Sequence, residues 1–198
     1  GQVDAAANGF DPHTLLRDFD TGRTRRLASG RVLRSFELVA LEQELEVAPG
    51  LTFPAWTYNG RIPGPTIRAR EGERVRVAFA NGSNHPHTVH FHGIHAAEVD
   101  GVPGQGAGII DPGQRTVYEF DASPFGMHLY HCHVRPLAEH IAKGLYGAFI
   151  VDPADGREDA DEMVMVMHGL DTNFDRENEI YAVNGIGFAY MDPPIRVK

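Results

Sequence analysis

The only cysteine of the chain lies in the segment HLYHCHVRPLAEH, which covers residues 128–140. Cys132 stands between His131 and His133, and His140 follows eight residues later. A second histidine-rich segment, HPHTVHFHGIH, covers residues 85–95. Cysteine thiolates and histidine imidazoles are side chains that bind copper and zinc in proteins. These two segments are therefore the candidate site of chemistry.

The spacing within each segment predicts on which side of the backbone the ligands lie. Residues two apart on a β-strand point to the same face, so His90 and His92 share one face. The same rule places His131 and His133 on one face and turns Cys132 to the opposite face. One strand thus offers two imidazoles to one metal site and a thiolate to another.

The thiolate of Cys132 needs partners on its own face. His140 follows it through a short loop, and His87 lies on the face opposite to the His90 pair because it is three residues earlier. Two histidines and one thiolate with a weak fourth ligand are the signature of a blue-copper electron-transfer site. Leu145 has the spacing of the usual axial Met. Without that thioether Cu(I) is favoured, so we predict a raised reduction potential.

Three alternatives to a copper site stay open for the histidine clusters. A single histidine is usually a hydrogen-bonded core or surface residue, but clustered imidazoles repel on protonation and have no evident packing role. Zinc accepts the same ligand types, although its ligands usually gather into one tetrahedron. A cysteine nucleophile with a histidine base would have no use for the other four histidines. We favour copper over these alternatives.

The bulk composition excludes several classes of protein. The formal net charge of the 198 residues is −9, which argues against a nucleic-acid partner because such binding relies on basic patches. No apolar run approaches the length of about 20 residues that a membrane span needs. The start GQVDAAANG, without Met, fits an exported chain whose leader has been removed, and it fits a trimmed chain equally well.

Short alternating segments predict an all-β fold. Residues 32–50 alternate apolar and polar side chains over several stretches, and RVRVAFA, residues 74–80, alternates strictly. TVYEFDA (116–122) and GAFIVDP (147–153) predict two more strands, and RPLAEHIAKG (135–144) predicts a short helix. The segment DPHTLLRDF contains a cap and proline that suit a short helix, but we favour a simple arm. Residues 32–152 therefore predict a β-sandwich or barrel of short strands.

The chain divides into four expected parts: an N-terminal arm (1–30), a first β domain (31–153), an acidic linker (154–162) and the beginning of a second, truncated β domain (163–198). The second domain is inferred from a weak repeat. Asn59-Gly60 leads to Pro65-Thr-Ile-Arg68, and Asn184-Gly185 leads to Pro194-Ile-Arg196. A coincidental pairing is the alternative. His168, in the apolar segment EMVMVMHG, is interpreted as structural.

Three segments resemble the copper-binding segments of multicopper oxidases: HTVHFHG (87–93), AEVDG (97–101) and HLYHCHVRPLAEHIAKGLYGAFIVDP (128–153). The resemblance is to the two-domain, laccase-like type of the cupredoxin superfamily, which is related to copper nitrite reductases. It implies cupredoxin-like Greek-key β-barrels or sandwiches, with the second domain incomplete here. It also implies a homotrimer that acts outside the cytoplasm, extracellular or periplasmic.

The resemblance implies which residues bind copper. The type 1 copper ligands are His87, Cys132 and His140, with Leu145 at the axial position without coordinating. A trinuclear cluster of type 2 and type 3 copper is shared with the second domain of a neighbouring subunit, and this chain contributes His90, His92, His131 and His133, with His90 our choice for type 2. Asp100 matches a residue that helps deliver protons to the cluster, although a turn Asp before Gly101 is an equal alternative.

The activity that the resemblance implies is oxidation of a small reducing substrate, such as phenols, aromatic amines or metal ions, coupled to reduction of dioxygen to water. The His-Cys-His tripeptide would then connect two copper sites covalently. This chain holds four of the eight cluster ligands that the family needs, so a second domain must complete the cluster. A copper nitrite reductase and a blue-copper electron-transfer fragment are the alternatives.

Overall fold

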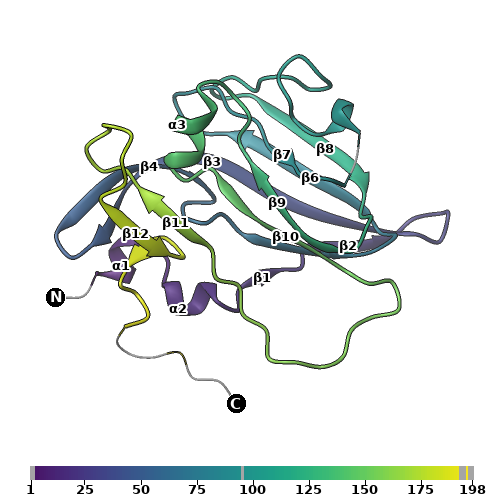
Figure 1. Ribbon diagram of the computed structural model, residues 1–198. Helices are drawn as coiled ribbons and strands as arrows, with labels where there is room; N and C mark the ends of the chain where they lie inside the picture. The colour runs from purple at the N-terminus through teal and green to yellow at the C-terminus, as the bar shows by residue number, and fades with distance from the viewer. Residues whose placement is uncertain (1–2, 95, 192–194, 196–198) are drawn as a thin grey trace.

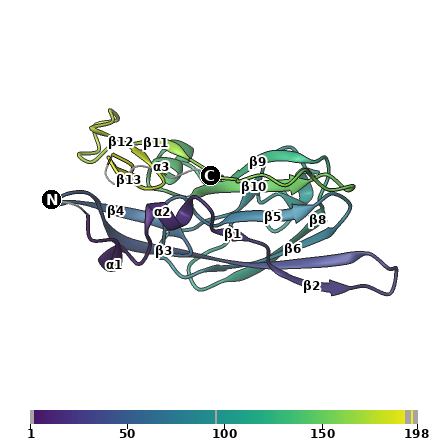
Figure 2. The ribbon, with the colours of Figure 1, turned by 90° about the horizontal axis from the view of Figure 1, so that it is seen from below.

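Two β-sheets face each other and form most of the molecule in the computed structural model, which describes residues 3–94, 96–191 and 195 (Figures 1 and 2). The first sheet has the order β1 (Phe19–Asp20), β5 (Thr66–Arg70), β10 (Tyr146–Asp152), β9 (Gly126–His131) and β7 (His90–Phe91). The second has the order β2 (Arg23–Arg26), β3 (Val32–Ala48), β6 (Arg74–Asn81) and β8 (Arg115–Asp121), and β4 (Leu51–Tyr58) pairs with β3. The predicted all-β fold is confirmed.

Both sheets mix parallel and antiparallel pairs. In the first sheet β5 runs parallel to β1 and β10, while β9 is antiparallel to both β10 and β7. In the second sheet β3 is parallel to β6 and antiparallel to β2 and β4. The β7–β9 pair aligns His90 with His131, so the two histidine-rich segments become neighbours on one sheet edge.

An aromatic cluster fills the space between the two sheets. Phe91 of β7 is fully buried, and its ring lies 4.9 Å from Phe120, 5.7 Å from Tyr130 and 5.9 Å from Phe149. Burying an aromatic side chain of this size stabilises a fold by roughly 2–3 kcal/mol. Because Phe91 lies between His90 and His92, this packing fixes where the first histidine pair projects.

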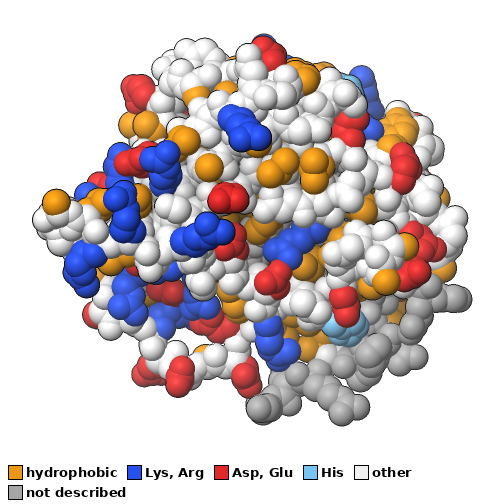
Figure 3. All heavy atoms as spheres, turned by 180° about the vertical axis from the view of Figure 1, so that it is seen from behind, with side chains coloured by type: hydrophobic (Ala, Val, Ile, Leu, Met, Phe, Trp, Pro, Cys, Tyr) orange, Lys and Arg blue, Asp and Glu red, His pale blue; other side chains and the backbone are white. Residues whose placement is uncertain are grey.

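The outer face of the second sheet is charged, as the view from behind shows (Figure 3). Arg74 of β6 pairs with Glu119 and Asp121 of β8, and Arg31 pairs with the same aspartate. Such exposed pairs each contribute little to stability, but their charges keep this face hydrated. The strands that carry the histidine-rich segments, β7 and β9, belong to the first sheet instead.

A second apolar cluster joins the N-terminal and C-terminal parts of the chain. It contains Phe10 and Leu15 from the N-terminal segment and Leu170 and Ile186 from the last three strands, packed on the far half of β3. Those last strands form a small sheet of β11 (Met167–Leu170), β12 (Ile180–Val183) and β13 (Ile186–Gly187). The segment between β10 and β11 contains no helix or strand, at the place where the linker is expected.

The N-terminal segment is more than a simple arm, which corrects our expectation. It contains two short helices, α1 (Ala5–Asn8) and α2 (Pro12–Leu15), besides strands β1 and β2. Asp11 caps α2 by accepting the backbone N–H of His13 at 2.8 Å, and Leu15 is buried. The cap and the proline are visible in the sequence, and burial of Leu15 against the second apolar cluster supplies the stability that a four-residue helix lacks alone.

The two Asn-Gly pairs of the proposed repeat adopt the same backbone conformation. Asn59 and Gly60 have φ of 55° and 75°, and Asn184 and Gly185 have φ of 50° and 87°. Both pairs form the left-handed turn that suits hairpins. Pro194 and Arg196 of the second copy lie outside the described residues. None of the helices in the described part of the chain has the length and apolar character that a membrane crossing requires.

His168 of β11 is a half-buried histidine with a hydrogen bond to the backbone. Its Nε2 accepts a hydrogen bond from the backbone N–H of Gly185 at 3.0 Å, and its ring lies 5.6 Å from that of Tyr146. Burial lowers the pKa of His168 from 6.5 to about 4. The neutral imidazole is therefore the form that the fold accepts.

This burial predicts a loss of stability in acid. The unfolded chain protonates His168 near pH 6.5, whereas the folded chain resists protonation until about pH 4, so the free energy of unfolding falls across that window. We expect His168→Gln to reduce this loss by about 2 kcal/mol, because its amide oxygen can accept the same N–H without gaining charge.

Urea unfolding of both chains at about pH 7.5 and about pH 4.5 measures the difference, since every other titrating group is common to both. An equal acid loss in the two chains would contradict the assignment.

Candidate metal centre

Helix α3 (Leu137–Ala142) lies at one end of the sandwich (Figure 1). Three buried ligand atoms converge there, one of them from His140 of the helix itself. The Sγ of Cys132, which directly follows β9, lies 3.3 Å from Nδ1 of His140 and 3.7 Å from Nδ1 of His87. The two Nδ1 atoms lie 3.2 Å apart. His87, Cys132 and His140 are at most 3% exposed, and we call this group the buried site.

The electrostatics of the buried site favour neutral ligands. Burial, followed by the neighbouring His140, lowers the pKa of His87 to about 3. Burial also lowers the pKa of His140 and raises the pKa of the Cys132 thiol. Neutral imidazoles bind metal directly, and a metal ion reverses the effect on the thiol by stabilising the thiolate. A soft sulfur with two imidazole nitrogens in a dry pocket fits copper.

Backbone contacts hold the buried site in shape. The N–H of Thr88 donates to the sulfur of Cys132 at 3.4 Å, and the Thr88 hydroxyl accepts the N–H of His133 at 2.9 Å. Leu145 is fully buried, its carbonyl accepts the N–H of Cys132, and its N–H donates to the carbonyl of His140. These contacts fix the sulfur relative to both neighbouring segments.

Trp56 of β4 covers the buried site, a role that the sequence does not indicate. Its ring centroid lies 4.8 Å from that of His140, 5.3 Å from that of His87 and 4.4 Å from that of His85. His85 in turn bonds Glu42 at 2.7 Å. The sequence predicts core packing alone for Trp56. Only the folding of β4 against α3 brings it to the ligands, and no local motif signals that contact.

A second group of histidines, which we call the open site, lies on the adjoining sheet edge. It consists of His90, His92 and His131, whose ring nitrogens lie within 4.8 Å of one another, with Nε2 of His92 and His131 2.7 Å apart. Nδ1 of His131 contacts the carbonyl of Cys132 at 2.6 Å, which leaves its Nε2 for a metal. His92 is exposed, so one side of the open site faces outward.

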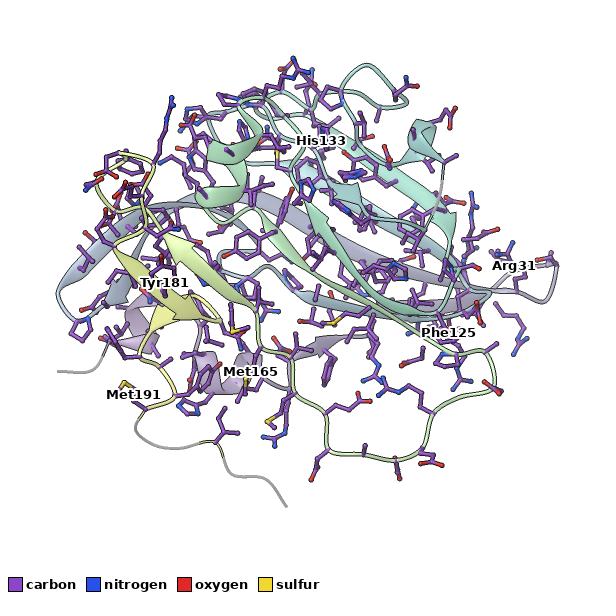
Figure 4. The ribbon with its side chains drawn as sticks, viewed as in Figure 1. Arg31, Phe125, His133, Met165, Tyr181 and Met191 are labelled. Atoms are coloured by element: carbon purple, nitrogen blue, oxygen red, sulfur yellow. The ribbon has the colours of Figure 1, made fainter. Side chains whose placement is uncertain are left out.

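His133, the fourth predicted cluster ligand, lies beside the open site (Figure 4). Its ring is 5.0 Å from that of His90 and 5.8 Å from that of His131, with which it stacks at 20°. Its nitrogens are not within the 4.8 Å that joins the other three. The structure thus places His131 and His133 on the same side, as the alternation of side chains along a strand predicts. His133 lies at the margin of the open site rather than within it.

Asp100 holds His90 in place. The carbonyl of Asp100 lies 3.1 Å from Nδ1 of His90, and its carboxylate lies 3.3 Å from the same nitrogen. Asp100 follows the short 3₁₀ helix Ala97–Val99 and is buried. Gly101 comes next with φ of 68°, and a Cβ there would lie 2.3 Å from the Val89 carbonyl. Glycine is thus required for the close approach of the AEVDG segment to the backbone of Val89.

Two imidazoles of the open site, those of His90 and His131, are also held neutral. Burial lowers the pKa of His90, and the neighbouring histidines add to this, while Asp100 opposes it. Burial lowers the pKa of His131 to about 4. Orienting carboxylate and carbonyl groups behind the ring nitrogens are typical of metal-binding histidines.

The chain matches known copper proteins. The family model described as multicopper oxidase matches residues 41–156. A solved structure described as a multicopper oxidase is 58% identical, with a TM-score of 0.96, and the alignment covers 98% of this chain and 69% of that one. The cupredoxin-like class of fold predicted from the sequence is thereby confirmed.

Two curated relatives carry different activities in their names. A copper-containing nitrite reductase of Neisseria gonorrhoeae is 36% identical over 135 residues, which cover 67% of this chain and 33% of that protein. Laccase-2 of Botryotinia fuckeliana is 35% identical over 128 residues, which cover 62% of this chain and 22% of that protein. The chain thus spans about a third or less of the length of these relatives.

Copper loading tests the two groups separately. We expect copper to give an intense thiolate-to-copper absorption band and to quench the fluorescence of Trp56, which is the only tryptophan. Cys132→Ser removes the soft ligand and should abolish the band.

His92→Ala is the matched control, because it changes only the open site and should keep the band. An unchanged band in Cys132→Ser would place the copper elsewhere.

Proposed function

Because the chain belongs to the multicopper oxidase family, we propose that it is the substrate-oxidising part of a laccase-like enzyme. The enzyme couples one-electron oxidation of phenols, aromatic amines or metal ions to four-electron reduction of dioxygen to water. The observation that carries this proposal is the link between the two sites. Cys132 belongs to the buried site, its peptide neighbour His131 belongs to the open site, and its other neighbour His133 lies beside the open site.

Each residue has a distinct part in this proposal. His87, Cys132 and His140 would hold the type 1 copper, and Leu145 would lie beside it without coordinating. His90, His92, His131 and His133 form this chain's half of the trinuclear centre. Bound copper supplies one-electron exchange at the buried site and reduction of dioxygen at the open site. Asp100 orients His90 through the contacts of its carbonyl and its carboxylate with Nδ1, and it would help to deliver protons to the centre.

The remaining half of the trinuclear centre comes, in this proposal, from the second domain of a neighbouring copy in a homotrimer. The exposure of His92 supports an open side that another surface covers. Met127 and Leu129 lie on the same side of β9 as His131, and their side chains are 63% and 53% exposed. Phe125, labelled at the far end of β9 in Figure 4, extends this apolar strip. Apolar strips beside an incomplete site are typical of interfaces.

We also propose the division of the chain into a first domain (31–153) and the start of a second (163–198). The solved multicopper oxidase continues beyond the region that this chain matches, since the chain covers 69% of it. The matching Asn-Gly turns agree with a repeated domain. Export to the periplasm or the extracellular space belongs to the same proposal.

A copper nitrite reductase is the second candidate, supported by the identity with the Neisseria enzyme. That class feeds a single type 2 copper from the type 1 site. Three histidines converge at the open site with a fourth beside it, which is one more than a mononuclear site of that kind uses. A blue-copper electron carrier leaves all four without a role. The histidine number therefore favours the oxidase.

Because this chain supplies only half of the proposed trinuclear centre, gas exchange is measured on the copper-loaded protein with a complete second domain, and it separates the candidates. With a phenol as donor we expect oxygen uptake, more than one copper per chain and no nitric oxide from nitrite. His92→Ala should lower the oxygen uptake at least roughly a hundredfold while the blue band stays, because it removes a first ligand of the open site.

Nitric oxide formation without oxygen uptake would establish the reductase instead. One copper per chain with neither activity would leave only the electron carrier.

Leu145 gives a second test, on the reduction potential of the buried site. Leu145→Met adds a thioether at the axial side, which stabilises Cu(II) relative to the three-coordinate site. We expect the potential to fall by at least about 59 mV, the equivalent of a tenfold change for one electron. Leu145→Ile, which adds no ligand, is the control, and an equal shift in both variants would exclude axial ligation as the cause.

A further inference from the structure

A groove separate from both metal groups lies between α3 and the loop that joins β11 to β12. Its volume is about 680 Å³, within the range of small-molecule sites. Ala138, Ala142 and Lys143 line it from the helix, and Phe174 and Arg176 line it from the loop. This groove has no part in the binding of copper by the ligands described above.

The walls of the groove suit a flat aromatic ring. Phe174 is 53% exposed and stacks on Phe53 with ring centroids 6.2 Å apart and an interplanar angle of 27°. Phe53 supports one side of the ring, the Lys143 ammonium lies 4.4 Å from its centroid, and about half of the side chain remains exposed to a ligand. Ala138 and Ala142 are four residues apart, so they lie on one face of the helix. Their small side chains leave a shallow, flat wall across the groove from Phe174. Aromatic rings pack well against such surfaces.

The polar groups around the groove have unused hydrogen-bond donors. Within the described residues no carboxylate lies at ion-pair distance from Arg176, and the ammonium of Lys143 donates only to the Pro54 carbonyl, at 3.3 Å. Asp171 uses both carboxylate oxygens on the backbone N–H groups of Asp175 and Arg176. Asp171 and Glu139 both keep free acceptor sites, because a carboxylate has about four, and their charges balance those of Lys143 and Arg176. The guanidinium of Arg176 is therefore the cation of the groove that is left without an ion pair among the described residues.

The loop holds two of the lining residues in an unusual backbone conformation. Phe174 has φ of 64° and Arg176 has φ of 80°, which non-glycine residues rarely adopt. The Asp171 carboxylate fixes this conformation through its bonds to the backbone N–H groups that follow. Strained residues that are held by their surroundings occur preferentially at binding sites.

The groove is also connected to the buried site by contacting side chains. The Nζ atom of Lys143 lies 4.4 Å from the ring centroid of Phe174 and 5.2 Å from that of Trp56. Trp56 lies against His140, with centroids 4.8 Å apart. His140 occupies the inner face of α3, and the groove runs along the outer face of the same helix.

We propose that this groove binds a small aromatic acid, in particular a phenol that carries a carboxylate. The ring lies against the exposed part of Phe174 and against Ala138 and Ala142, and the carboxylate pairs with the guanidinium of Arg176. A role of this molecule as electron donor rests on the proposed function, whereas its binding does not.

Three phenols of equal size and different charge test the proposal on the metal-free chain. Phloretate, para-propylphenol and tyramine all have a two-carbon chain para to the phenol hydroxyl. The chain ends in a carboxylate, a methyl group and an ammonium, respectively. We expect isothermal calorimetry to show that phloretate binds at least roughly fivefold more tightly than para-propylphenol and that tyramine binds weakest. Equal affinities, or tightest binding of tyramine, would overturn the proposal.

Matched variants locate the binding in the groove. Arg176→Glu keeps a non-glycine residue in the same backbone conformation and should weaken phloretate roughly tenfold while para-propylphenol is unchanged. Arg25→Glu makes the same charge change on the exposed strand β2, outside the residues that line the groove, and should leave both affinities unchanged. Phe174→Leu removes the aromatic face and should weaken both compounds.

A loss of phloretate affinity in Arg25→Glu equal to that in Arg176→Glu would show a general charge effect and overturn the site. The proposed function is judged separately, on the copper-loaded protein. If phloretate binds as expected but does not bleach the blue band, the groove stands as a binding site and the oxidase proposal loses its donor. If the groove variants change neither binding nor bleaching, the groove proposal alone fails.

Discussion

The alternation of side chains at the end of β9 is the constraint on which both metal groups depend. His131 and Cys132 are joined by one peptide bond, yet the strand geometry sends the imidazole to the sheet edge and the sulfur to the interior. A helix would have separated them by about 100° and brought neither to the partners that they have here. The aromatic packing of Phe91 then fixes the neighbouring strand, which supplies the other imidazoles.

The two groups differ in their exposure to water, and this difference follows from where the sheet ends. The buried site is covered by α3 and by Trp56, so its ligands stay neutral and its sulfur is protected from solvent. The open site faces outward through His92. A low-dielectric site suits electron exchange because little solvent must reorganise, whereas an open site admits small molecules and additional ligands.

The sequence predicted what depends on local spacing. The paired histidines and the apolar residues of the strands recur every second position, and Cys132 falls between two of these histidines. The structure keeps this alternation. Trp56, Thr88 and the loop containing Phe174 were not predicted as parts of a site, because only contacts between segments far apart in the chain bring them there. The short helix α2 was underestimated for the same reason, since its stability comes from burial of Leu15 in a distant cluster.

The length of strand β3 has a consequence for how the whole chain unfolds. Its first half buries Phe36 and Leu38 between the two sheets, and its second half buries Leu45 and Val47 in the cluster that contains the last three strands. The same continuous strand therefore belongs to both apolar clusters, with a register shift against β4 only between Glu46 and Ala48. Melting of either cluster frays a strand that the other needs, so the two are expected to unfold as one cooperative unit rather than as independent foldons.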